Sequence, residues 1–177
     1  NGKLIGDFTL ANLGPTNLGN YDEFFIAGSG IAEEFHMRWF EENLNANRSN
    51  QEYDTVEIIP HGTGKVGLHV AGPNSRKLLE KLTDTDISSE TFRFMDIQVI
   101  NVGIVSCLVG RVSFTGDLGY EIWMTPEQQH YVMDLLQKEG EEYYIRLFGL
   151  RALNSLRLEK NYGSWSTEYR PDYGPLE

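Results

Sequence analysis

Several features are scarce or absent in this sequence of 177 residues, and each absence excludes a class of protein. The single cysteine, Cys107, cannot form an internal disulfide, and its apolar surroundings favour a buried, unreactive thiol in a reducing compartment. Basic residues are few, 15 against 26 acidic ones, and the net charge of −11 argues against nucleic acid or an anionic membrane surface as the main partner. No apolar run approaches the ~20 residues of a membrane-spanning helix.

Motifs of several common enzyme classes are also missing. The four histidines, at positions 36, 61, 69 and 130, are scattered without the spacing of zinc ligands. No Gly-x-Gly-x-x-Gly fingerprint is present, so the sequence shows no dinucleotide-binding motif. What remains is an ordinary globular composition, with 40% hydrophobic and 23% charged residues.

Hydrophobic periodicity and turn residues predict strand pairs that alternate with helices, in the order ββαββαβββαα, which is an α+β layout. Strands are expected at 3–13, 23–27, 54–59 and 66–71 and within a β-rich block at 96–124. Helices are expected at 31–44, 75–83, 126–138 and 147–160. The segment His61–Gly64 predicts a hairpin turn between the third and fourth strands.

Asp7 is the first candidate site residue. Both faces of the expected strand 3–13 are largely apolar, so a carboxylate in its middle should be buried on one side, where an unpaired charge is costly. The alternative is a strand-end or edge position at which the carboxylate reaches water. The residue pattern alone leaves both interpretations open.

Glu121 and Arg151 are two further polar residues in largely apolar patterns. Strand alternation puts Glu121 and Trp123 on one face and their apolar neighbours on the other, although a surface glutamate is equally compatible with the pattern. Arg151 lies at helical spacing between Leu147 and Leu158. A snorkelling arginine or a salt bridge between packed helices would explain it as well as a functional role.

Three segments, in this order and at these distances, resemble the folate-binding T-protein (aminomethyltransferase) family. They are GKLIGDFTL at 2–10, SFTGDLGYEI at 113–122, and SLRLEKNYGSW at 155–165 running on to YGPLE at 173–177. The resemblance covers nearly the whole chain and extends in particular to the folate domain of dimethylglycine and sarcosine dehydrogenases. It implies one aminomethyltransferase-like domain over residues 1–177, with two interleaved ferredoxin-like α+β subdomains. The family's N-terminal segment and C-terminal β-barrel are expected to be absent from this sequence.

The resemblance also implies a reaction and the residues that carry it. Tetrahydrofolate would be the cofactor, and an aminomethyl or methylene group from an amine-derived substrate would give 5,10-methylenetetrahydrofolate. Asp7 matches the catalytic acid beside the reactive nitrogens of the folate, and Glu121 matches a carboxylate that binds the pterin ring. Arg151 matches an arginine near the benzoyl-glutamate portion. Phe25 and Ala27 match positions that wall the pterin, and core packing is an equally good account of both.

The implied partners are the amine substrate and folate, together with an attached FAD domain or a lipoyl carrier protein. The implied location is the bacterial cytoplasm or the mitochondrial matrix. A non-catalytic folate-binding or regulatory module on the same fold, such as the regulatory subunit of pyruvate dehydrogenase phosphatase, is the alternative. A demethylase of the same superfamily acting on a sulfonium compound is a third possibility. The joint presence of Asp7, Glu121 and Arg151 favours the enzyme.

Overall fold

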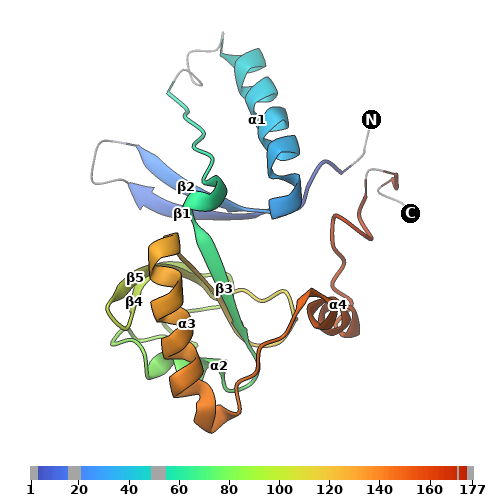
Figure 1. Cartoon of the computed structure of the whole chain (residues 1–177). Helices are drawn as coiled ribbons and strands as arrows, with labels where there is room; N and C mark the ends of the chain where they lie inside the picture. The colour runs from blue at the N-terminus through green and yellow to red at the C-terminus, as the bar shows by residue number, and fades with distance from the viewer. Residues whose placement is uncertain (1–3, 16–20, 49–54, 171, 175–177) are drawn as a thin grey trace. The chain divides into compact units, whose positions relative to one another are not determined.

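The structure is a computed structural model that describes residues 4–15, 21–48, 55–170 and 172–174. The chain divides into two compact units (Figure 1). Unit 1 comprises Asn1–Gly62 and Gly163–Glu177, and unit 2 comprises Thr63–Tyr162. Each unit has an antiparallel sheet and helices, so the fold is mixed α/β with two sheets. In the described part of the chain, no helix combines the length and apolar character needed to cross a membrane.

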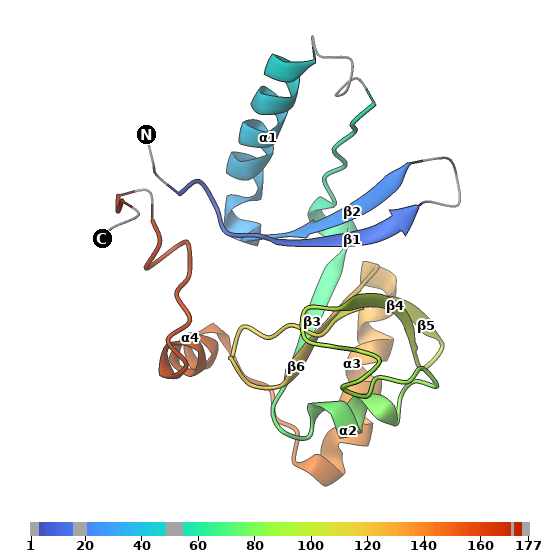
Figure 2. The same ribbon diagram turned by 180° about the vertical axis from the view of Figure 1, so that it is seen from behind.

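Unit 2 is built on a four-stranded antiparallel sheet with the order β3–β6–β5–β4. The strands are β3 (Val66–Ala71), β4 (Ile97–Val102), β5 (Val105–Gly110) and β6 (Gly119–Met124). The helices are α2 (Ser75–Glu80), α3 (Pro126–Gly140), the 3-10 turn η4 (Glu141–Tyr143) and α4 (Leu150–Glu159). Helices α2 and α3 lie against the same face of the sheet (Figure 2), and the core of the unit fills the space between them.

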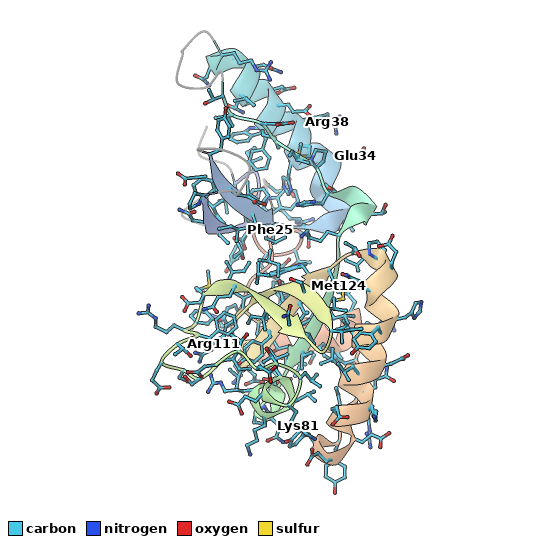
Figure 3. All side chains as sticks on the ribbon, turned by 90° about the vertical axis from the view of Figure 1, so that its left-hand side faces the viewer. Phe25, Glu34, Arg38, Lys81, Arg111 and Met124 are labelled. Atoms are coloured by element: carbon cyan, nitrogen blue, oxygen red, sulfur yellow. The ribbon has the colours of Figure 1, made fainter. Side chains whose placement is uncertain are left out.

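Alternation along the strands determines which side chains enter this core. Tyr120 and Ile122 are fully buried, and Met124 of the same strand is 3% exposed (Figure 3). Fully burying such a side chain contributes roughly 1.5–3 kcal/mol, so this face dominates the stability of the unit. Cys107 is also buried, as predicted, and burial raises the pKa of its thiol to about 11. The thiol therefore stays protonated at neutral pH.

Helices α2 and α3 begin where the sequence predicts, whereas α4 begins at Leu150 instead of at position 147. Pro126 occupies the first position of α3, where its missing N–H breaks no helical hydrogen bond. The side-chain oxygen of Gln128 accepts a hydrogen bond from the backbone N–H of Thr125 at 3.4 Å, which completes a capping box. The leucines of the predicted helix 75–83 face inward, as expected: Leu78, Leu79 and Leu82 are buried.

Unit 1 contains a β-hairpin and one long helix. The hairpin consists of β1 (Thr9–Pro15) and β2 (Asp22–Ala27), and the 3-10 turn η1 (Gly30–Ala32) leads into α1 (Glu33–Asn47). The ring of Phe8 lies 4.7 Å from that of His36 and 5.3 Å from that of Phe40, so the residues before β1 pack on α1. Trp165, from the C-terminal part of the chain, lies 4.9 Å from His36. This aromatic cluster joins the two chain segments of unit 1.

Two strand predictions are wrong. Within the described residues, the first strand begins at Thr9, and residues 4–8 form no strand. Residues 56–61 form no strand, and position 54 lies outside the described residues. The 3-10 turn η3 (Gly62–Gly64) follows them, and β3 pairs with β6 instead of with a preceding strand. Val56 and Ile58 line a hollow together with Leu44 of α1, so this apolar run lies beside a helix and not in a sheet.

Candidate functional site

Polar residues gather on the face of the unit 2 sheet that lies opposite α2 and α3. The alternation of β6 places Glu121 and Trp123 on this face, as predicted. In the sheet register, Glu121 lies opposite His69 of β3 on one side and opposite Gly110 of β5 on the other. The name Glu121 face is used below for the surface formed by His69, Gly110, Glu121 and Trp123.

Glu121 has the electrostatic features of a binding carboxylate. Its side chain is half-buried, and burial raises the pKa of the carboxyl group. Among the residues that the structure describes, none donates a hydrogen bond to this carboxylate or forms an ion pair with it. A carboxylate removed from water without a protein partner is costly unless a ligand supplies the donors. A bound molecule with N–H groups would therefore stabilise the charged form.

Trp123 forms a flat aromatic surface next to Glu121. Its indole lies between two glycines of the neighbouring strands. A Cβ at Gly67 would lie 3.1 Å from its Cδ1 atom, and a Cβ at Gly110 would lie 3.1 Å from its Cζ3 atom. Side chains at either position would push the indole off the sheet. The glycines therefore allow the ring to lie close to the strands beside the carboxylate.

His69 is the second titratable group on this face, and the sequence patterns did not identify it. Its Nε2 atom lies 3.2 Å from the hydroxyl of Ser113, and its ring lies 6.1 Å from that of Phe148 in an edge contact. Burial lowers the pKa of His69, so the ring is neutral at neutral pH. The spacing of histidines along the sequence can indicate a metal site, but it does not indicate a histidine that lies opposite a carboxylate in a sheet. The signal that reveals His69 is the strand register, which puts it directly opposite Glu121.

Arg151 lies on α4, away from the buried side of that helix. Its side chain is exposed in the first turn. Leu147 precedes the helix and is 72% exposed, and Leu158 is 55% exposed. These two leucines, between which Arg151 lies at helical spacing, therefore do not form a buried face of unit 2. The exposed guanidinium leaves Arg151 free to meet an anionic group of a ligand.

Arg157 is the buried arginine of the same helix, at 2% exposure. Its Nε donates to the side-chain oxygen of Asn154 at 3.0 Å, and its Nη1 donates to the carbonyl of Tyr162 at 2.8 Å. The guanidinium also lies over the ring of Phe114, 5.9 Å from its centre. These contacts tie α4 to the glycine-rich turn before β6, so Arg157 positions the loop that holds Ser113.

Asp7 departs from the expectation of a buried strand residue. Its side chain is exposed, and it lies in the segment before β1, which has no regular secondary structure. The adjacent Phe8 carries the packing instead, because its ring fills the space beside two glycines. A Cβ at Gly6 would lie 2.5 Å from this ring, and a Cβ at Gly28 would lie 2.7 Å from it. The carboxylate of Asp7 is left facing water.

Phe25 and Ala27 lie where predicted, on β2, and both are half-buried. In the hairpin register they are opposite Ala11 and Thr9, and the ring of Phe25 lies 5.9 Å from that of His61 (Figure 3). The predicted site residues are thus divided between the units: Asp7, Phe25 and Ala27 belong to unit 1, and Glu121 and Arg151 belong to unit 2.

The fold and the Glu121 face define a mixed α/β protein with a half-buried carboxylate on one sheet. Residues 1–177 match the GCVT N-terminal domain family over their whole length, and the chain belongs to this family. The resemblance drawn from the three sequence segments is thereby confirmed.

Relatives of known name support the same assignment. The chain is 33% identical over 176 residues to the mitochondrial dimethylglycine dehydrogenase of Homo sapiens, covering 99% of this chain and 19% of that protein. It is 34% identical over 183 residues to the mitochondrial sarcosine dehydrogenase of Mus musculus, with the same coverages. It is 27% identical over 176 residues to an aminomethyltransferase of Halothermothrix orenii, covering 45% of that enzyme. The chain therefore spans about a fifth to a half of the length of these relatives.

A solved structure shares the fold. It is the heterotetrameric sarcosine oxidase from Corynebacterium sp. U-96, in complex with pyrrole 2-carboxylate. The TM-score is 0.53 at 15% identity, and the match covers 82% of this chain and 69% of that one. At this identity the likeness shows the fold alone.

Proposed function

We propose that this chain is a tetrahydrofolate-binding domain of an enzyme that transfers a one-carbon unit from an amine-derived substrate. Membership of the GCVT family supports the proposal, as do relatives named aminomethyltransferase, dimethylglycine dehydrogenase and sarcosine dehydrogenase. Tetrahydrofolate, when bound, supplies the two nitrogens that take up the one-carbon unit to give 5,10-methylenetetrahydrofolate. FAD would belong to an attached domain, since the described residues carry no dinucleotide-binding βαβ unit.

The observation that carries the proposal is the half-buried carboxylate of Glu121, for which the described residues provide no donor. A pterin ring presents a ring N–H and an exocyclic amino group side by side, and a carboxylate accepts both in a two-pronged hydrogen bond. The indole of Trp123 lies on the same face of β6 as this carboxylate and adds aromatic surface to the site. The residues present therefore fit a pterin.

The remaining roles follow from the chemistry of each side chain. Asp7 would accept a proton from the folate or stabilise a developing cation beside it, which requires an ionised carboxylate. Arg151 would pair with the glutamate portion, and Phe25 and Ala27 would contact the pterin as apolar walls. We further propose that the two units are the interleaved α+β subdomains of the family. The composition of unit 1 from both ends of the chain supports this.

A binding experiment tests the proposal. Tetrahydrofolate is titrated by calorimetry into the full-length protein and into a Glu121→Gln variant, with Glu80→Gln, an exposed glutamate of α2, as the matched control. The amide turns one acceptor into a donor that faces the pterin amino group, so affinity should fall about 5- to 100-fold. The control should bind as the wild type does. Equal affinity of all three proteins would remove Glu121 from the site.

A non-catalytic folate-binding module is the second candidate. The exposed position of Asp7 is the observation that favours it, because a general base normally lies in a more enclosed environment. Binding alone does not separate the two candidates. The activity of an Asp7→Asn variant does, and its expected outcome is given in the Discussion.

A further inference from the structure

His69 has no role in the proposed function, yet it occupies the position opposite Glu121 in the sheet. Facing residues of an antiparallel pair have Cβ atoms about 4.5–5.5 Å apart, so both side chains can reach one ligand. Gly110, on the other side of Glu121, has no side chain to contribute. Any second polar contact from the neighbouring strands must therefore come from β3, where His69 is the polar residue opposite the carboxylate.

A chain of hydroxyl groups determines how the ring of His69 is protonated. The hydroxyl of Thr115 lies 2.7 Å from that of Ser113, and the latter lies 3.2 Å from Nε2 of His69. Backbone N–H groups already donate to both hydroxyl oxygens, Asp117 to Thr115 at 3.3 Å and Thr115 to Ser113 at 3.3 Å. Each hydroxyl therefore keeps one lone pair and its own hydrogen, so it can accept one bond and donate one bond along the chain.

Counting donors and acceptors gives one consistent arrangement. Thr115 is 2% exposed, and in the described part of the chain the oxygen of Ser113 is the acceptor available to its hydroxyl hydrogen. Ser113 then donates to Nε2 of His69. A neutral imidazole that accepts at Nε2 carries its proton at Nδ1. Burial, which lowers the pKa of His69, keeps the ring in this neutral form.

The Nδ1–H group produced in this way is a donor in need of an acceptor. Nδ1 is the ring nitrogen that does not face Ser113, and His69 lies opposite Glu121 in the register of β3 and β6. No group among the described residues accepts a hydrogen bond from it. The Glu121 face therefore presents two acceptor oxygens and, on the adjacent strand, one fixed donor.

We propose that His69 is a ligand-recognition residue that donates Nδ1–H to the ring carbonyl of a pterin held by Glu121. The inference rests on the proposed function and adds the specificity of the same site. In a pterin the carbonyl oxygen follows the exocyclic amino group and the ring N–H along one edge. The carboxylate accepts the first two groups, and the imidazole donates to the third. A pteridine with an amino group in place of the carbonyl lacks the adjacent ring N–H and also puts a donor against this donor, so His69 adds to the discrimination that Glu121 provides.

The test compares two ligands in four forms of the full-length protein. The ligands are tetrahydrofolate and its 4-amino analogue, in which an amino group replaces the ring carbonyl. The proteins are the wild type, His69→Asn, His69→Gln and, as a matched control, His130→Gln on the exposed side of α3. Asparagine keeps an amide nitrogen near the position of Nδ1, whereas glutamine places its amide near the position of Nε2.

We expect the wild type and the His130→Gln control to prefer tetrahydrofolate over the 4-amino analogue. In His69→Gln, tetrahydrofolate should bind about 3- to 10-fold more weakly. The preference ratio, which is the affinity for tetrahydrofolate divided by the affinity for the 4-amino analogue, should fall by about the same factor or more. His69→Asn should retain most of the preference. Thermal melting of each variant identifies any change caused by loss of folding.

Nitrogen-15 NMR of the wild type tests the inference without any substitution, because it reports which ring nitrogen of His69 carries the proton. A proton on Nδ1 supports the assignment, and a proton on Nε2 overturns it. An unchanged preference ratio in a folded His69→Gln protein also overturns it. Failure of the wild type to bind tetrahydrofolate at all would instead overturn the proposed function, and with it the ligand named here.

Discussion

At the residue scale, Glu121 combines a charge with a position that disfavours charge. Its pKa is raised by burial, so the folded protein holds this proton more tightly than the unfolded chain does. The stabilising effect is fully present below the ordinary pKa of a glutamate, and it is lost as the pH rises through the raised pKa of the folded state. At neutral pH the ligand-free protein therefore bears the cost of an ionised, half-buried carboxylate.

Removal of that charge should stabilise the ligand-free protein. We expect Glu121→Gln to melt a few degrees higher than the wild type at pH 7, and the difference should vanish near pH 4. Thermal melts at the two pH values measure this, with Glu80→Gln as a control that should show no such pH dependence. A variant that melts at or below the wild-type temperature at pH 7 would show that burial does not penalise this carboxylate. The gain in stability accompanies the loss of folate affinity predicted above.

Asp7 gives the test that separates an enzyme from a binding module. Asp7→Asn should leave folding unchanged, because the side chain is exposed. Asparagine cannot take up a proton at neutral pH, so one-carbon transfer should fall about 100- to 10,000-fold if the carboxylate acts on the folate. Single-turnover formation of 5,10-methylenetetrahydrofolate by the full-length protein measures the effect, with Asp22→Asn at the start of β2 as the control. A full transfer rate in the Asp7→Asn protein would favour the non-catalytic module.

The residue patterns predicted the sheet face on which Glu121 lies, but they did not identify His69 or place Asp7 correctly. Strand alternation alone separates Glu121 and Trp123 from the buried face of β6. His69 requires the pairing of β3 with β6, which joins two strands that are far apart in the sequence. The prediction that Asp7 is buried was wrong because two glycines leave room for the ring of Phe8, which packs there instead. Hydrophobic periodicity does not reveal close packing of this kind.

At the element scale, helices were predicted more accurately than strands. Helices α2 and α3 begin at the expected residues because local signals, such as Pro126, mark their first turns. The expected strand at 54–59 fails because a short apolar run fits a helix surface as well as a sheet, and here Val56 and Ile58 lie beside Leu44 of α1. Partner choice is a tertiary property, so the sequence of one strand cannot reveal it.

A single glycine in the turn between β4 and β5 allows this turn to lie close to α3. Gly103 has a φ of +60°, and a Cβ there would lie 2.6 Å from the hydroxyl of Tyr131 and 2.7 Å from a methyl group of Leu135, both on α3. We expect Gly103→Ala to destabilise the protein by about 1–3 kcal/mol, from backbone strain and the clash with α3. Chemical denaturation measures this. Gly64→Ala, with no atom within 4 Å of the added Cβ, should change stability far less, and equal effects would contradict the argument.

At the scale of the whole molecule, the chain does not divide in sequence order. The expected single domain over 1–177 contains two compact units, and the second lies entirely within one continuous segment, Thr63–Tyr162. The buried residues of the hydrophobic core, the first of which is Leu78 and the last Leu136, all lie within this segment. Unit 1 depends on both ends of the chain, since Trp165 contacts His36 and donates from its indole nitrogen to the carbonyl of Leu4 at 3.4 Å. Long-range contacts of this kind leave no local pattern in the sequence.

The two units should therefore differ in their ability to fold alone. A fragment of residues 63–162 retains the complete core of unit 2 and both helices that cover its sheet, so we expect a cooperative thermal transition and dispersed NMR signals. A fragment of residues 1–62 lacks Trp165, which leaves the aromatic cluster around His36 incomplete, and an isolated hairpin with one helix has little other core. It should give no cooperative transition. A 63–162 fragment that melts without cooperativity would show that unit 2 needs the chain ends for its stability. Its folding would make the Glu121 face accessible to titration with pterins in isolation from unit 1.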